Sequence, residues 1–251
     1  MAGYVDLDGV RTWYDERGSG EPLVLLHGGL SDSRIFTGNL DTLAERFHVY
    51  LPERRGHGHT PDVEGPITIE LMTRDTIAFL DKVVGGPARL AGYSNGASIA
   101  LEVALQRPDL VERLVLVSGV FAAEGMLVKP EPGAPVPEEM AKLYAEVSPD
   151  GPEHFPVVVA KIAEVVGKEP AHDVADLARV GCRTLVMTGD DDIVSLEHTV
   201  ELYRGIPDAE LAIVPRATHL LLMEKPELCT RIVGEFLAGE PAPTFMPMRR
   251  V

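Results

Sequence analysis

Ser94 stands in a Gly-x-Ser-x-Gly pattern, between Gly92 and Gly96, that suits it to act as a nucleophile. An apolar run at residues 89–92 precedes the pattern, and a helical pattern rich in small residues follows it at 95–106. A serine on such a strand-to-helix turn needs neighbours without side chains, because the backbone bends sharply and the helix packs close to the strand. The turn also places the serine at a helix N-terminus, where unpaired N–H groups favour a developing negative charge. The pattern therefore predicts a serine that attacks a carbonyl carbon.

A histidine and a group of aspartates further along the chain are the partners that such a serine requires. His219 follows an apolar run at residues 211–214, and Asp190, Asp191 and Asp192 follow another at 185–188. A serine hydroxyl is a weak nucleophile until a base accepts its proton, and a carboxylate orients that base. We therefore expect Ser94 to be the nucleophile, His219 the base and one of the three aspartates the acid.

The elements that must position these residues alternate between strand and helix patterns. Helical patterns occupy residues 39–46, 69–84, 95–106, 196–204 and 226–237, and apolar runs typical of strands occupy 10–14, 23–26, 49–51, 89–92, 114–117, 185–188 and 211–214. Several of these runs are apolar throughout, which is typical of strands covered on both faces of a parallel sheet. The alternation predicts an α/β fold with a doubly wound, mostly parallel sheet.

The rhythm changes between residues 120 and 181. Four prolines crowd residues 130–137, and helix-like patterns follow at 138–147 and 153–167. We interpret 120–181 as a small helical lid inserted into a core formed by 1–119 and 182–239, with Phe121, Tyr144 and Phe155 lining the entrance to the site. The alternative is a surface excursion without a gating role. Residues 240–251, with three further prolines, are expected to form a mobile tail.

The motifs resemble those of the α/β-hydrolase family, and the resemblance spans nearly the whole chain. The segments that carry it are Leu25-Leu26-His27-Gly28-Gly29, Arg54-Arg55-Gly56-His57-Gly58-His59-Thr60, Gly92-Tyr93-Ser94-Asn95-Gly96, Gly189-Asp190-Asp191-Asp192 and Ala217-Thr218-His219. The order serine, aspartate, histidine along the chain is that of this family. The resemblance implies an oxyanion hole formed by the backbone N–H groups of Gly29 and Asn95. It implies a structural role for His27.

The identity of the acid depends on the register of the aspartates. The Gly-x-x-Asp spacing typical of the family, counted from Gly189, reaches Asp192. A register shifted by one residue would instead select Asp191. We expect Asp192 to orient His219.

Composition restricts the partners. The net charge of −16 repels nucleic acid and anionic membranes. Two cysteines, 182 and 229, have neither disulfide-scaffold density nor metal-site spacing, which favours a cytoplasmic protein. His57 and His59 lack a third ligand pattern, so no metal is expected. We expect a small-molecule substrate and no cofactor, and the sequence does not indicate an oligomeric state.

These features predict a cofactor-independent serine hydrolase that cleaves a small neutral or apolar carboxylic ester or lactone through an acyl-enzyme. Family members that hydrolyse epoxides or haloalkanes carry aspartate where this chain has Ser94, so their mechanism is disfavoured. Two alternatives stay open. One is hydrolysis of a carbon–carbon bond, or of an enol-lactone, in aromatic ring-cleavage products. The other is a ligand-binding receptor that keeps the catalytic residues but turns over very slowly.

Overall fold

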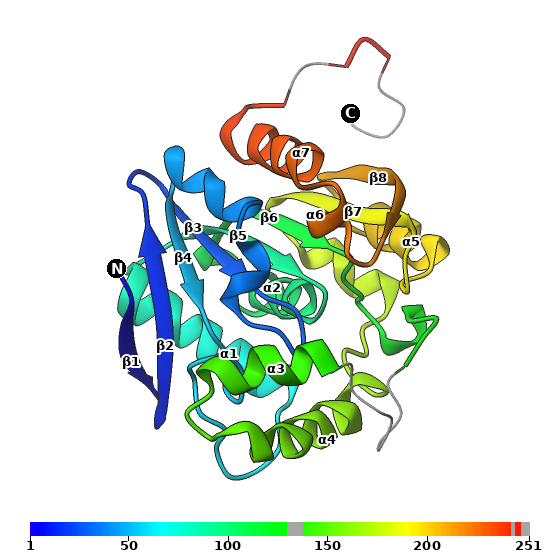
Figure 1. Ribbon diagram of the computed structural model, residues 1–251. Coiled ribbons are helices and arrows are strands. Elements are labelled where there is room, and N and C mark those ends of the chain that lie inside the picture. Colours follow the sequence, from blue (N-terminus) through cyan, green and yellow to red (C-terminus); the bar gives the residue numbers. More distant parts are fainter. Residues whose placement is uncertain (130–137, 242–243, 247–251) are drawn as a thin grey trace.

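The computed structural model describes residues 1–129, 138–241 and 244–246, which form one eight-stranded sheet with helices on both faces (Figure 1). The strands lie in the order β1-β2-β4-β3-β5-β6-β7-β8. Their bounds are Gly3–Leu7 (β1), Val10–Arg17 (β2), Pro22–Leu26 (β3), His48–Pro52 (β4), Ala88–Tyr93 (β5), Val111–Val117 (β6), Arg183–Asp191 (β7) and Ala209–Thr218 (β8). The pairs β1–β2 and β2–β4 are antiparallel and the other neighbours are parallel. The predicted doubly wound, mostly parallel sheet is confirmed.

Strand β1 differs from the sequence prediction, which contained no strand before residue 10. It pairs only with β2, at the antiparallel edge of the sheet, and its side chains alternate between partly buried and exposed positions until Leu7. Because the strand has one buried face and only five residues, it lacks the continuous apolar run that marks the central strands.

The helices that cover the sheet belong to two separate cores. Their bounds are Ile69–Phe79 (α1), Asn95–Gln106 (α2), Glu138–Val147 (α3), Phe155–Val166 (α4), Leu196–Gly205 (α5), Leu221–Glu224 (α6) and Pro226–Ala238 (α7). Residues of α1, α2 and α5 pack in one core, and residues of α6 and α7 pack in the other, together with Phe36, Leu40 and Leu43. The pattern predicted for 39–46 forms a short 3-10 helix, Leu40–Glu45. No helix of the described residues is long and apolar enough to cross a membrane.

The segment between β6 and β7 contains α3 and α4, which lie together at one end of the molecule (Figure 1). Tyr144 of α3 and Phe155, Val158 and Ile162 of α4 are buried in the same core as α1 and α2. The prolines of residues 130–137 and most of the predicted tail, 240–251, lie outside the described residues.

Strands β3, β5, β6, β7 and β8 run parallel, so their carboxyl ends meet at one edge of the sheet. The residues that follow them include Gly29, Ser94, Ser118, Asp192 and His219. Ligand sites of open α/β sheets form at this edge. The topology therefore brings together residues that are up to 190 positions apart, from Gly29 to His219.

Candidate active site

Ser94 lies on the turn between β5 and α2, in a backbone conformation with φ 54° and ψ −122° that L-residues rarely adopt. The close approach of the flanking elements requires glycine. A Cβ at Gly92 would lie 2.2 Å from the Gly96 carbonyl oxygen, and a Cβ at Gly96 would lie 2.1 Å from the Leu26 carbonyl oxygen. The turn thus holds Ser94 at the end of the sheet, and the strain is maintained by the packing on both sides.

Three side chains form a continuous hydrogen-bonded chain at this edge. His219 Nε2 lies 2.9 Å from Ser94 Oγ, and His219 Nδ1 lies 2.7 Å from Asp192 Oδ1. A carboxylate only accepts hydrogen bonds, so Nδ1 carries the imidazole proton and Nε2 is free to accept the proton of the serine hydroxyl. This arrangement can activate the hydroxyl as a nucleophile.

The Asp192 side chain is fully buried, and its oxygens are satisfied by neighbouring donors. Ser118 Oγ and Thr188 Oγ1 donate to Oδ2 at 2.6 and 3.0 Å, and the Val194 N–H donates to Oδ1 at 3.1 Å. Burial alone would raise the pKa of Asp192, but the hydrogen bond and charge of His219, with the donors from Ser118 and Val194, lower the pKa to about 2. Asp192 is therefore ionised at neutral pH and stabilises a protonated His219.

The other two aspartates lie elsewhere. Asp190 Oδ1 accepts the Ala217 N–H at 3.1 Å, and this contact joins the ends of β7 and β8. Asp191 is exposed at the end of β7. Of the three candidates for the acid, the structure thus places Asp192 against His219.

Gly29 and Asn95, the two residues expected to form the oxyanion hole, line the same cavity as Ser94. Within the described residues, the backbone N–H groups of Gly29 and Asn95 donate to no protein acceptor. The next N–H of the loop, that of Leu30, donates to His57 Nε2 at 3.3 Å. Two N–H groups beside the serine are therefore available to a substrate oxygen, whereas that of Leu30 is already engaged.

The cavity that contains Ser94 has a volume of about 340 Å³ and is mainly apolar. The segment 120–181 contributes Val120, Met126, Val128, Met140, Ile162, Val166 and Glu169 to its lining. Glu169 and His219 are the only ionisable side chains among the described residues that line it, and Glu169 Oε2 accepts the Ile69 N–H at 2.9 Å. Among its described residues, this cavity offers mainly apolar surface and no lysine or arginine.

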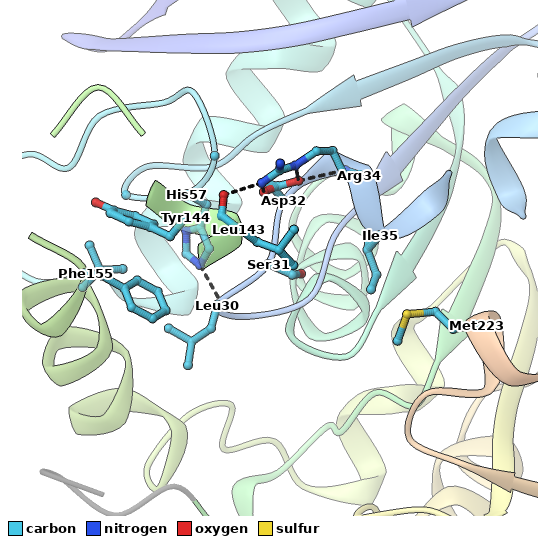
Figure 2. A pocket seen from close by; sticks show the side chains of 13 residues that line it. Leu30, Ser31, Asp32, Arg34, Ile35, His57, Leu143, Tyr144, Phe155 and Met223 are labelled. Carbon is cyan, nitrogen blue, oxygen red and sulfur yellow. Dashed lines mark hydrogen bonds and ion pairs between the residues drawn. The ribbon is translucent and has the colours of Figure 1, made fainter. Parts of the chain in front are cut away.

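A second cavity of about 160 Å³, whose lining is drawn in Figure 2, shares Leu30 with the Ser94 cavity. Tyr144 and Phe155 line this second cavity, and Phe121 is buried in a stack with the His198 ring. The expectation that these three aromatic residues line the entrance to the Ser94 cavity is therefore wrong, because they face the adjoining space or the core. Aliphatic and methionine side chains of the segment line the Ser94 cavity instead.

Arg34 joins the loop after β3 to helix α3 beside the second cavity. Its guanidinium donates to Asp32 Oδ1 and Oδ2, to the Leu143 carbonyl oxygen and to Glu146 Oε2, and Figure 2 shows the contacts to Asp32 and Leu143. These contacts hold α3 against the core.

Three residues that the sequence did not indicate support the hydrogen-bonded chain. Ser118 and Thr188 donate to Asp192, and Tyr93 Oη donates to the His219 carbonyl oxygen at 2.9 Å. All three lie at the carboxyl edge of the sheet. Each of these hydroxyl residues stands at or just after the end of an apolar run, which could have placed it near the site. The sequence does not indicate which group each hydroxyl contacts.

Buried histidines brace the surroundings of the site. His57 Nδ1 bonds to the Arg55 carbonyl oxygen at 2.9 Å, which leaves Nε2 as acceptor for Leu30, and burial with the charge of Arg54 lowers its pKa to about 4. His198 Nε2 accepts the Phe121 N–H, and burial lowers its pKa to about 4 as well. Both histidines are neutral at physiological pH and act as hydrogen-bond acceptors.

Comparison with known proteins agrees with the fold. Residues 23–232 match the sequence profile of the alpha/beta hydrolase family, and the chain belongs to this family. It is 24% identical to (E)-2-((N-methylformamido)methylene)succinate hydrolase of Acinetobacter baylyi, over 91% of this chain and 94% of that protein. It is 26% identical to 2-hydroxy-6-oxo-6-phenylhexa-2,4-dienoate hydrolase of Burkholderia cepacia, over 93% of each.

Among solved structures, the chain is similar to a serine hydrolase involved in carbazole degradation, with a TM-score of 0.79 and 25% identity over 95% of this chain and 98% of that one. These relatives are hydrolases, and the names of the first two describe different substrates. The chain is therefore a hydrolase of the alpha/beta family.

The buried histidines generate a prediction for stability. The free energy of unfolding should fall as the pH drops from about 6.5 to about 4, because an unfolded histidine, with a pKa of 6.5, binds a proton that folded His57 and His198 do not. Each contributes up to about 1.4 kcal/mol per pH unit. The variant His57→Gln keeps an acceptor for the Leu30 N–H. As the pH drops, its free energy of unfolding, measured with urea, should fall by about 1 kcal/mol per pH unit less than that of the wild type. Parallel curves for the two proteins would contradict the assignment of His57.

Proposed function

We propose that this protein is a serine hydrolase that cleaves a neutral, apolar carboxylic ester or lactone, with Ser94 as nucleophile, His219 as base and Asp192 as orienting acid. The observation that carries the proposal is the hydrogen-bonded chain from Asp192 through His219 to Ser94. Ser94 lines a mainly apolar cavity whose described residues include no lysine or arginine. The mechanism needs no cofactor, because the three side chains supply the nucleophile and the proton transfers.

In the proposed mechanism, His219 Nε2 accepts the hydroxyl proton as Ser94 Oγ bonds to the carbonyl carbon. The oxygen of the tetrahedral intermediate accepts hydrogen bonds from the Gly29 and Asn95 N–H groups. Protonated His219, stabilised by ionised Asp192, then gives its proton to the leaving alkoxide and leaves an acyl-enzyme. Water, deprotonated by His219, attacks this ester to form a second tetrahedral intermediate. This intermediate releases the acid as His219 returns the proton to Ser94 Oγ.

The lining of the cavity supports a neutral substrate. A carboxylate in a mainly apolar cavity requires a cation or several donors, whereas Glu169 adds a negative charge beside this cavity. The volume of about 340 Å³ falls at the small end of the range of ligand pockets, about 300–1,000 Å³, which favours a short or medium acyl chain. The segment 120–181, which supplies much of this lining, acts in this proposal as the lid.

A second candidate is hydrolysis of a carbon–carbon bond in a dienoate, favoured by the similarity to the Burkholderia cepacia hydrolase. That substrate name describes an anionic acid, for which the Ser94 cavity offers no cation among its described residues. An assay of dienoate consumption beside chromogenic esters separates the two candidates, and faster turnover of the dienoate would overturn the ester proposal.

We predict that Ser94→Ala abolishes both fluorophosphonate labelling and ester turnover while the fold stays intact. The variant loses the only oxygen that His219 Nε2 contacts among the described residues. The oxyanion hole can leave a residual rate about 10³- to 10⁴-fold above water, so the rate is compared with that of the wild type. Mass spectrometry of the labelled wild-type peptide identifies the modified residue, and labelling of another serine would disprove the assignment.

For the acid, Asp192→Asn should lower kcat by roughly 10³- to 10⁴-fold, because an amide in place of the carboxylate favours the wrong imidazole tautomer and removes the negative charge. Asp191→Asn is the matched control and should keep kcat within about twofold, since Asp191 is exposed at the end of β7. Steady-state kinetics of both variants on one chromogenic ester decide between them. A larger loss in the Asp191 variant would overturn the assignment.

For the lid, Ile162→Trp should shift the preference toward shorter acyl chains. Ile162 lines the Ser94 cavity, and each methylene that loses its buried position costs about 0.8 kcal/mol, or roughly fourfold in kcat/KM. Val157→Trp is the control, because Val157 lies on the exposed side of the same helix. A panel of p-nitrophenyl esters measures both profiles, and an unchanged profile in the Ile162 variant would show that this helix does not limit the chain.

A further inference from the structure

Arg54 is a buried cation without a carboxylate partner among the described residues. The residue is only 3% exposed. Nη2 donates to the Gly28 carbonyl oxygen at 2.8 Å and lies 3.0 Å from His27 Nδ1, whereas Nε and Nη1 have no hydrogen-bond partner in the described structure. The neighbouring Arg55 is different, because its guanidinium is paired with Asp75 through two hydrogen bonds of 2.8 and 2.9 Å. Arg55 thus has an evident structural role, and Arg54 does not.

The burial of Arg54 is unfavourable for folding. A buried charge without a counter-charge loses its hydration without regaining it from the protein. Burial lowers the pKa of Arg54 to about 9, so the group is still charged at neutral pH. The nearby rings of His27 and His57 are neutral, because burial and the charge of Arg54 lower the pKa of each. Stability therefore does not explain a cation at this position.

The contacts of Arg54 converge on one peptide group. The Gly28 carbonyl oxygen also accepts from Ser31 Oγ at 3.1 Å and from His27 Nδ1 at 2.8 Å. His27 Nε2 accepts the Arg54 backbone N–H at 3.2 Å, so in the neutral ring Nδ1 carries the proton and is the donor to Gly28. Arg54 Nη2, 3.0 Å from Nδ1, is then another donor to the same Gly28 oxygen and does not donate to the ring. Three donors, one of them charged, thus hold this carbonyl oxygen in the interior.

The N–H on the other side of this peptide is that of Gly29. The carbonyl and N–H of a trans peptide point in opposite directions, so fixing the Gly28 oxygen in the interior directs the Gly29 N–H away from Arg54. Gly29 lines the Ser94 cavity. The following N–H, that of Leu30, is held by His57 (Figure 2), so the loop is anchored on both sides of Gly29.

We propose that Arg54 is a positioning residue that polarises the Gly28–Gly29 peptide and so strengthens the Gly29 N–H as a donor to the tetrahedral intermediate on Ser94. This inference rests on the serine hydrolase mechanism proposed above. A cation bonded to the carbonyl oxygen withdraws electrons from the peptide and makes its N–H more positive. The field of the same charge, in a region of low dielectric constant, also favours the negative oxygen that forms in the intermediate.

The test uses the variant Arg54→Met, which removes the charge and leaves Ser31 and His27 to hold the Gly28 oxygen. Removal of a whole oxyanion-hole donor costs about 10²- to 10³-fold in kcat. Because the Gly29 N–H stays in place here, we expect a smaller loss in kcat, about 10- to 100-fold, with KM within about threefold. The Tm should be unchanged or higher, since an uncompensated buried charge is lost.

A pair of inhibitors tests the oxyanion directly. An alkyl trifluoromethyl ketone adds the serine oxygen and forms an anionic tetrahedral adduct, whereas the matching methyl ketone binds without this addition. In Arg54→Met, the Ki of the trifluoromethyl ketone should rise about 10- to 100-fold, and that of the methyl ketone should change by less than about threefold. A wild-type enzyme that binds both ketones equally would instead contradict the serine mechanism itself, so the two failures are distinguishable.

Arg89→Met is the control variant. Arg89 is also a buried arginine, but it is paired with Glu21 and Glu112 at the start of β5, the end of the strand opposite to Ser94. This variant should lose Tm and keep kcat. The proposal is overturned if folded Arg54→Met keeps kcat within about threefold, or if both ketones weaken equally. It is also overturned if Arg54→Met fails to fold, because the cation would then be structural.

Discussion

The approach of α2 to the ends of β5 and β3 is the constraint on which the rest of the site depends. Neither Gly92 nor Gly96 could carry a Cβ without overlapping a backbone carbonyl oxygen or carbon. With α2 packed this closely against the strands, the chain turns from strand to helix at a single residue, Ser94, which has a positive φ. The same turn places the first N–H groups of α2 beside Ser94. Backbone packing thus determines both the position of the nucleophile and that of one candidate oxyanion donor.

The site contains two buried charges of opposite sign, and their surroundings differ. Asp192 is surrounded by donors, which outweigh the cost of its burial and lower its pKa to about 2. Arg54 has few partners, and its burial lowers its pKa to about 9. In the proposed mechanism, positive charge develops on His219, beside Asp192, and negative charge develops near Gly29, in front of Arg54. Asp192 thus lies against the group that becomes positive, and in our proposal Arg54 acts on the oxygen that becomes negative through the Gly28–Gly29 peptide.

The sequence predicted those features that depend on local geometry. The alternation of elements gave the fold class, because each central strand carries its own apolar signal. The Gly-x-x-Asp spacing predicted that Asp192, and not Asp191, contacts His219. In the structure β7 ends at Asp191, and Asp192, the next residue, bonds to His219. Features that depend on packing between distant segments were not predictable. Ser118 contacts Asp192 across 74 positions, and the direction in which Tyr144 faces depends on how α3 lies on the core. The edge strand β1 was not predicted either, because it pairs only with β2 and carries no apolar run.

The lining of the cavity is the feature by which the substrate of this chain can differ from those of its relatives. The chain shares its family with these relatives, and their names describe chemically different substrates. A nucleophilic serine with two backbone donors attacks any carbonyl that reaches it, so the bond is selected by what the cavity holds there. The names of the two relatives above describe a succinate and a dienoate, both anions. In this chain the segment between β6 and β7 contributes methionine, valine and isoleucine, with Glu169 as its one charge within the described lining. Membership of the family therefore does not identify the substrate of this protein, and our proposal of a neutral one rests on the lining of the cavity.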